Sequence, residues 1–170
     1  DKYPRTFEAD CAQLREAGVE FLFAPTETDL YPEPQTYVVE PAGIQFLLEG
    51  ECRPGHFRGV ATVVMKLFQI VQPDVALFGK KDFQQVMVIK NMVRDMGFSI
   101  EIIDSPTTRA DDGLALSSRN GYLSPKERHE AVRLHQQLQK VRSAIFAGEW
   151  DFAKLEKAAM NHLDEHGWKT

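Results

Sequence analysis

The stretch DVALFG, KKDFQQVMVIKNMVRDMG and FSIEIID, residues 74–79, 80–97 and 98–104, decides the fold. Its first and last parts are short apolar runs typical of buried strands. The middle part has the length and amphipathic spacing of a helix that ends at Gly97. A strand, a helix and a strand in this order predict a β-α-β unit with parallel strands and a right-handed crossover. The sequence therefore predicts an α/β fold, a parallel sheet with helices on its faces.

Helices and strands also alternate before this unit. We predict a helix over residues 5–18, strands over 19–25 and 36–41 separated by a loop, and a short helix over 42–50. After a polar connection at residues 51–59, apolar residues recur at helical spacing from Val60 to Val71, which predicts one more helix.

The pattern changes after residue 105. Residues 105–123 form a long polar loop in this interpretation, and residues 124–148 form one long helix. Ser124 is a good N-cap, Pro125 suits the first helical position, and Glu127 completes a capping box. Another helix is expected at residues 151–167, so we predict two domains, residues 1–105 and 106–170.

Composition narrows the class of function. The chain has 170 residues, 43% of them hydrophobic, and a formal net charge of −5. That charge argues against a nucleic acid or an anionic membrane as the main partner, because both require a basic face. It does not exclude a small anionic ligand. No apolar run approaches the roughly 20 residues of a membrane span, and no signal peptide is evident.

Cysteine and histidine usage predicts a cytoplasmic protein without a metal site of its own. Cys11 and Cys52 do not lie in a CxxC motif, which favours a reducing compartment. His162 and His166 are four residues apart on a predicted helix, but we expect no third ligand nearby.

The stretch FGKKDFQQ, residues 78–85, leaves a predicted strand and enters a helix. Ligands of open parallel sheets bind beyond the carboxyl ends of the strands, and a helix N-terminus there suits phosphate. Gly79 would let a ligand approach the backbone, Lys81 would pair with phosphate, and Asp82 would accept from ribose. A plain turn with solvated lysines and an N-cap at Asp82 explains the same residues equally well. One of the two glutamines at 84 and 85 should face the crevice, although a solvated helix face is the better interpretation of an isolated glutamine.

Two more polar stretches have both a functional and a structural explanation. In RPGHFRGV, residues 53–60, Arg53 and His56 could line the crevice, although taken alone a loop is the better interpretation. In DGLALSSRN, residues 112–120, two hydroxyls and a guanidinium match a polyphosphate, while Asn120-Gly121 is also an ordinary turn signal.

Together these three motifs, with YPRT at residues 3–6, resemble the pantothenate synthetase family over about residues 3–123. The resemblance implies a Rossmann-like nucleotidyltransferase domain, of which residues 1–105 are the C-terminal part. Residues 106–170 would begin a smaller C-terminal lid domain. It also implies a homodimer that uses ATP with Mg²⁺ to join pantoate and beta-alanine through a pantoyl adenylate, releasing pyrophosphate and AMP.

The resemblance assigns roles to residues of this chain. Catalytic roles fall to Lys81, Ser117, Ser118 and Arg119. ATP binding falls to those four and to Gly79, Lys80, Asp82, Thr108 and Leu116. Pantoate binding falls to Gln85, Val60, Val63 and Val64, with Arg53 and His56 as further lining residues.

The chain departs from the family pattern in several places. Lys80 and Thr108 replace residues that are usual in the family, and the chain begins without Met. The family's HxGH and NP.QF segments would lie before residue 1, and its last strands after residue 170. We therefore expect a central piece of the enzyme that is inactive alone. Two alternatives stay open: another nucleotidyltransferase of the superfamily, and a non-catalytic nucleotide-binding or dimerisation fragment.

Overall fold

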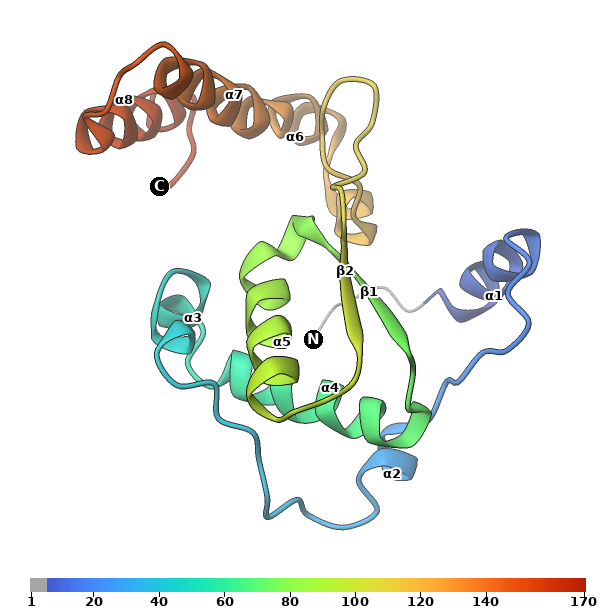
Figure 1. Cartoon of the computed structure of the whole chain (residues 1–170). Helices are drawn as coiled ribbons and strands as arrows, with labels where there is room; N and C mark the ends of the chain where they lie inside the picture. The colour runs from blue at the N-terminus through green and yellow to red at the C-terminus, as the bar shows by residue number, and fades with distance from the viewer. Residues whose placement is uncertain (1–5) are drawn as a thin grey trace. The chain divides into compact units, whose positions relative to one another are not determined.

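The computed structural model describes residues 6–170, which form two compact units, Thr6–Thr107 and Thr108–Thr170 (Figure 1). Residues 3–5 of the YPRT motif, and the first residue of the predicted N-terminal helix, lie outside the described residues. No helix in the described part of the chain is long and apolar enough to cross a membrane.

The first unit is built on the predicted β-α-β arrangement. Strand β1 (Val75–Gly79) leads through a short 3₁₀ helix, η2 (Lys80–Asp82), into helix α5 (Phe83–Asp95), and strand β2 (Glu101–Ser105) follows. The strands run side by side and pair in parallel, from Val75 opposite Glu101 to Gly79 opposite Ser105 (Figure 1). The predicted α/β class with a parallel sheet is confirmed.

Helix α4 (His56–Val71) begins four residues earlier than the valine pattern predicted. The reason is Phe57, which is only 1% exposed and lies on the same helical face as Val60, Ala61 and Val64. The second half of the predicted loop at residues 51–59 is therefore the first turn of this helix. Gly55 precedes the helix with a φ of +78°, a conformation that favours glycine.

The core of this unit lies between α4, α5 and one face of the two strands. It consists of the buried residues Phe57, Ala61, Phe68, Val88, Ile89, Met92 and Val93. Ala76, Phe78 and Ile102 of the strands pack against it, whereas Leu77 and Ile103 on the opposite face are exposed. The packing of one face of the sheet against α4 and α5 thus fixes the position of the strands and of their carboxyl ends.

The predictions for residues 19–50 were partly wrong. Helix α1 (Phe7–Glu16) is present, but residues 19–25 and 36–41 form no strand. A strand needs a neighbour to complete its hydrogen-bond ladder, and none of the described residues pairs with these segments. The loop between them contains a short helix, α2 (Glu27–Leu30), and the predicted helix at 42–50 is a 3₁₀ turn, η1 (Ile44–Phe46), followed by α3 (Glu49–Cys52).

The second unit begins with a polar hairpin and continues as helices. A 3₁₀ helix, η3 (Ser118–Tyr122), precedes α6 (Pro125–Glu130), α7 (Val132–Phe146) and α8 (Phe152–Asp164). The capping box of Ser124 and Glu127 is present as predicted. The predicted long helix is divided at Ala131, but that residue keeps helical dihedrals, φ −58° and ψ −23°, so the interruption is slight.

Candidate active site

The turn after β1 carries four of the predicted ATP-binding residues, Gly79 to Asp82, all of them exposed at the carboxyl end of the strand. Gly79 has φ −77° and ψ 131°, an extended conformation open to any residue. A Cβ atom built at Gly79 would meet nothing within 4 Å. The fold itself therefore does not require glycine here, and the open space beside its Cα is what a closely approaching ligand needs.

The two lysines of this turn have different partners. Lys80 Nζ lies 2.8 Å from one oxygen of Asp104 on β2, and Lys90 Nζ lies 2.6 Å from the other. The hydrogen bonds from Lys80 and Lys90 hold the pKa of Asp104 well below its usual range. Lys81 Nζ instead lies 3.2 Å from the exposed carboxylate of Asp82. Lys80 is therefore tied to the neighbouring strand, while Lys81 pairs with its own neighbour within the turn.

The two glutamines at the start of α5 also differ. Gln84 donates from Nε2 to the carbonyl oxygens of Ile44 and Leu47, both at 2.8 Å, and accepts from the Glu49 amide at 3.1 Å. Gln84 thus fastens the segment at residues 44–49 to α5. Gln85, half-buried beside it, takes no part in this set of bonds.

Arg53 and His56 belong to a small charged cluster that the sequence did not reveal. The Arg53 guanidinium forms an ion pair with Glu49 and lies 3.1 Å from His56 Nε2. Burial and then the charge of Arg53 lower the pKa of His56, against the opposing charges of Glu49 and Asp82. Glu49, the ion-pair partner of Arg53, donates its amide to Gln84 at the start of α5, so this cluster lies beside the helix that follows the turn after β1.

The three valines of the predicted pantoate wall are all half-buried on α4. Val60 and Val64 pack against the core cluster, while Val63 is not among the residues that do so. Val60 and Val64 therefore belong to the apolar face that packs into the core, and their spacing alone does not indicate a substrate wall.

The predicted lid residues of the second unit lie on one hairpin. The Leu116 amide donates to the Thr108 carbonyl at 2.9 Å, and Arg109 and Ala115 form an antiparallel bridge. The fold thus places Thr108 beside Leu116. Ser117, which follows Leu116 in the chain, is half-buried, and Ser118 and Arg119 are exposed. Ser117 caps η3, because its hydroxyl accepts from the Arg119 amide at 3.3 Å. This stretch has more regular structure than the long loop that we predicted.

The comparisons with known proteins agree over the whole chain. The family model described as pantoate-beta-alanine ligase matches residues 1–170. Proteins named pantothenate synthetase from Nitrosospira multiformis and Chromobacterium violaceum are 55% and 59% identical over 170 and 169 residues, which is 100% and 99% of this chain. The chain belongs to the pantoate–beta-alanine ligase family.

Solved structures of the family support the same conclusion. Pantothenate synthetase from Thermus thermophilus matches with a TM-score of 0.89 and 47% identity over 95% of this chain and 59% of that chain. Pantoate-beta-alanine ligase from Francisella tularensis, in complex with beta-gamma ATP and beta-alanine, matches with a TM-score of 0.83 and 38% identity over 97% and 60%. The predicted Rossmann-like nucleotidyltransferase fold class is thereby confirmed. The chain spans about 61% of the length of the two curated relatives.

The structure also shows polar contacts beside the family motifs that sequence reasoning missed. Arg128 binds the Asp112 carboxylate with both terminal nitrogens, at 2.7 and 3.1 Å, and so holds the tip of the hairpin against α6. The hydrogen bond from Arg128 lowers the pKa of Asp112. Only the opposite charges of these two residues, 16 positions apart, could have hinted at their contact.

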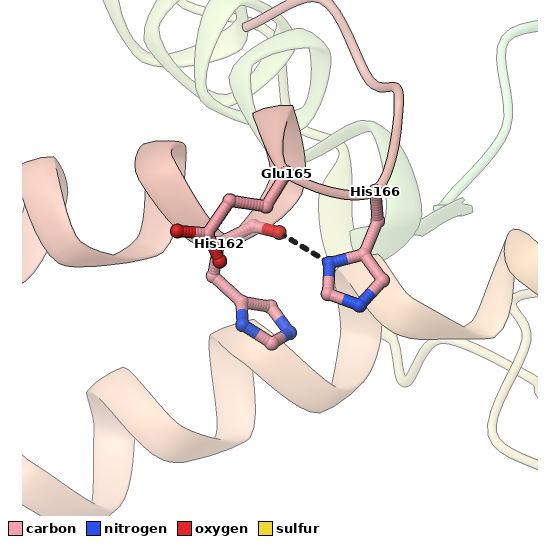
Figure 2. Close-up of side chains that lie close together, drawn as sticks. All are labelled: His162, Glu165 and His166. Atoms are coloured by element: carbon pink, nitrogen blue, oxygen red, sulfur yellow. Dashed lines mark hydrogen bonds between the residues drawn. The ribbon is translucent and has the colours of Figure 1, made fainter.

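One expectation outside the family motifs was wrong. Near His162 and His166 there is a third potential metal ligand, Glu165 (Figure 2). The sequence signal was available, because a residue three positions after the first histidine lies on the same helical face.

Proposed function

We propose that this chain provides part of the active site of an ATP-dependent ligase that joins pantoate to beta-alanine and yields pantothenate, AMP and pyrophosphate. Membership of the family carries the proposal. The exposed turn at residues 79–82, at the carboxyl end of a parallel strand, supports it. The chain spans 61% of the length of the two curated relatives, so the activity is proposed for a protein as long as these relatives. The turnover experiments below use a protein of that full length that contains this chain.

The proposed reaction has two displacements. A carboxylate oxygen of pantoate attacks the α-phosphorus of MgATP, and the bond to the departing pyrophosphate breaks. The amine of beta-alanine then attacks the acyl carbon of the adenylate, the bond to AMP breaks, and the nitrogen loses a proton. Such chemistry depends mainly on positioning and on charge stabilisation.

In the first unit, Lys81 would neutralise charge on the phosphates and on departing pyrophosphate. Gly79 would allow the nucleotide to approach the backbone, and Asp82 would accept from its ribose. The start of α5 provides the positive end of a helix dipole nearby, which favours phosphate. The pairing of Lys80 with Asp104 argues for a supporting role, in which Lys80 fixes the turn instead of touching ATP.

The organic substrate would be held by the remaining residues of this unit. Gln85 would hydrogen-bond pantoate. Its neighbour Gln84 is not suited to this role, because its side chain already bonds to the backbone at residue 44. Val60, Val63 and Val64 would provide an apolar wall for the two methyl groups of pantoate, and Val63 is the one least involved in the core. Arg53 and His56 would line the site through Glu49, which pairs with Arg53 and donates its amide to Gln84 on α5.

In the second unit, the hairpin would act as a lid on the nucleotide. Thr108 would lie near the adenine, and Leu116 to Arg119 would close on the phosphates. The short distance between Thr108 and Leu116 across the hairpin supports a joint role. A guanidinium with flanking hydroxyls is well suited to a polyphosphate.

The remaining parts of the proposal concern conditions and assembly. Mg²⁺ would enter with ATP as part of the substrate, the protein would form a cytoplasmic homodimer, and the 170-residue chain alone would turn over slowly. Light scattering on the purified protein tests the dimer. Assaying the chain alone beside a protein of the relatives' length tests the loss of turnover.

Pyrophosphate exchange tests the central proposal. Exchange into ATP should require pantoate, and AMP should be released only when beta-alanine is added as well. Other 2-hydroxy acids serve as controls for substrate identity. Release of ADP and phosphate, or exchange that is independent of pantoate, would overturn the proposal.

The lid is tested separately by Arg119→Ala and Ser117→Ala. Contacts that tighten as charge develops act mainly on kcat, so both variants should slow adenylate formation. The melting temperature should change little in Arg119→Ala and fall modestly in Ser117→Ala, which also loses the cap of η3. A loss of thermal stability as large as that of a core truncation, with unchanged kcat, would favour a purely structural turn.

A further inference from the structure

The end of α8 and the turn that follows it bring together three potential metal ligands, His162, Glu165 and His166. They occupy positions i, i+3 and i+4, so they lie on one helical face. Their ligand atoms all lie within 4.8 Å of one another, and Figure 2 shows the side chains grouped at the helix end. Both Glu165 and His166 are exposed and His162 is half-buried, so an ion can reach the group from solvent.

A hydrogen bond fixes the orientation of one imidazole. His166 Nδ1 lies 2.7 Å from the backbone carbonyl oxygen of His162, so Nδ1 donates its proton to that oxygen (Figure 2). The lone pair of a neutral His166 therefore remains on Nε2. A backbone carbonyl on the other ring nitrogen is the usual support of a histidine that binds a metal.

The second imidazole is also suited to act as a ligand. His162 is half-buried, and its ring is the second imidazole of the group. The Arg133 guanidinium contacts His162 Nε2 only at 3.5 Å, at the limit of a hydrogen bond. Arg133 has a stronger partner in Glu130, so a metal ion can replace this contact without leaving Arg133 unpaired.

Charges of both signs surround the group. Arg133 is neutralised by Glu130, whose pKa is lowered to about 2 by hydrogen bonds from Arg133 and Trp168. Lys140 also places a positive charge near His162, and Glu165 opposes it with a negative one. The carbonyl end of α8 adds a partial negative charge that favours a cation. The Glu165 carboxylate and the helix end therefore supply the negative charge that a metal ion requires here.

We propose that His162, Glu165 and His166 bind a divalent transition-metal ion such as Zn²⁺, with solvent completing the coordination. Two imidazole nitrogens and a carboxylate oxygen suit zinc, nickel or copper, whereas magnesium and calcium prefer oxygen alone. Zinc bonds of about 2.1 Å in a tetrahedron place neighbouring ligand atoms about 3.4 Å apart. The exposed side chain of Glu165 can reach this spacing by rotation about its χ angles, while His166 keeps its hydrogen bond to the His162 carbonyl.

The experiment is a titration of the full chain with Zn²⁺ against a chromophoric chelator, with thermal melting as a second measurement. The wild-type chain should bind one zinc ion, and its melting temperature should rise with zinc concentration, because the ion binds the folded state. Loss of an outer-shell partner of a metal ligand costs about 10- to 100-fold in affinity. His166→Ala and Glu165→Gln should therefore weaken binding at least about tenfold.

His129→Ala is the matched control. His129 is a histidine of the same unit that lies outside the cluster, so its loss should leave zinc affinity unchanged. Circular dichroism should confirm that each variant keeps its helices. An absence of saturable 1:1 binding to the wild-type chain would overturn the proposal, as would equal affinities of His166→Ala and His129→Ala. Magnesium at the same concentrations should produce neither effect.

Discussion

The turn at residues 79–85 and the hairpin at residues 108–119 both carry proposed ATP-binding residues, but they are held in place by different forces. The turn lies between a strand and a helix whose inner residues, such as Phe78 and Ile89, pack into an apolar core. The hairpin is held by backbone hydrogen bonds and by the exposed Asp112–Arg128 pair. Core packing supports the turn in addition to the Lys80–Asp104 ion pair, so the turn should depend less on pH and salt than the hairpin does.

This difference has a consequence for mutations. In the turn, adjacent residues of the same type have different roles. Lys80 and Gln84 make structural contacts, whereas Lys81 and Gln85 are proposed to bind ligand. One substitution should therefore affect activity while its neighbour affects stability. In the hairpin, a change that disturbs one contact should alter the shape that presents Thr108 and Leu116.

The largest expected effect is that of Lys81→Ala on adenylation. Loss of a charge-assisted donor to the phosphates should slow pyrophosphate exchange by about 30- to 1000-fold, by analogy with oxyanion donors. The melting temperature should stay nearly constant, because the ion pair of Lys81 is with the exposed Asp82.

Lys80→Ala is the control for that experiment. It should reduce exchange far less, and any loss of stability should be small because Lys90 still binds Asp104. Equal and small losses of exchange in the two variants would mean that both lysines belong to an ordinary solvated turn.

The next effect is expected in the hairpin, from Gly113→Ala. Gly113 has a φ of +94°, and a Cβ atom there would lie 2.7 Å from His135 Cδ2. Strain of the backbone and this contact together should lower the free energy of unfolding of the second unit by about 2 kcal/mol.

Gly148→Ala provides a matched control in the same unit. Gly148 has nearly the same φ, +96°, but a Cβ atom there would meet nothing within 4 Å. The difference between the two variants in denaturant unfolding should therefore isolate the contact with His135, about 1 kcal/mol. If the two variants lose equal stability, the hairpin does not depend on its packing against α7.

A smaller effect is expected from Gln84→Ala. The variant loses hydrogen bonds to Ile44, Leu47 and Glu49, and the net cost should be about 1 to 2 kcal/mol of unfolding free energy. Gln85→Ala should leave that free energy nearly unchanged and should raise the KM for pantoate. The reverse pattern, with activity lost in Gln84→Ala and stability in Gln85→Ala, would contradict the division of roles proposed for the turn.

The features that the sequence predicted correctly are those fixed by nearby residues. The β-α-β unit follows from apolar runs and helical spacing, and the capping box at Ser124 is complete within one short stretch that ends at Glu127. The strands predicted at 19–25 and 36–41 failed because a strand depends on a partner elsewhere. The bonds of Gln84 to residues 44–49 were missed for the same reason, since they join positions 35 to 40 apart.

The candidate site shows the same limit. Motif matching selected Lys80 and Lys81 together, and only the structure separates them, because the partner of Lys80 lies on the next strand. The apolar spacing of Val60, Val63 and Val64 likewise could not distinguish a substrate wall from the core. Their roles, like those of the lid residues, stay predictions that the experiments above can decide.

The smallest expected effect is that of Asp112→Asn, and it should depend on pH. Hydrogen bonds from Arg128 and then from the Leu114 amide lower the pKa of Asp112 in the folded chain. A lowered folded pKa means that the stabilisation is fully present above the unfolded pKa, about 3.9, and is lost as pH falls through the folded value. Asparagine can still accept from Leu114 but has no charge for Arg128. The variant should therefore melt slightly below the wild type at pH 7, and the gap should close below about pH 4 and shrink in high salt. Asp111→Asn, which removes the neighbouring exposed carboxylate, is the control. If its gap follows the same pH and salt dependence, net charge and not the Arg128 contact stabilises the hairpin.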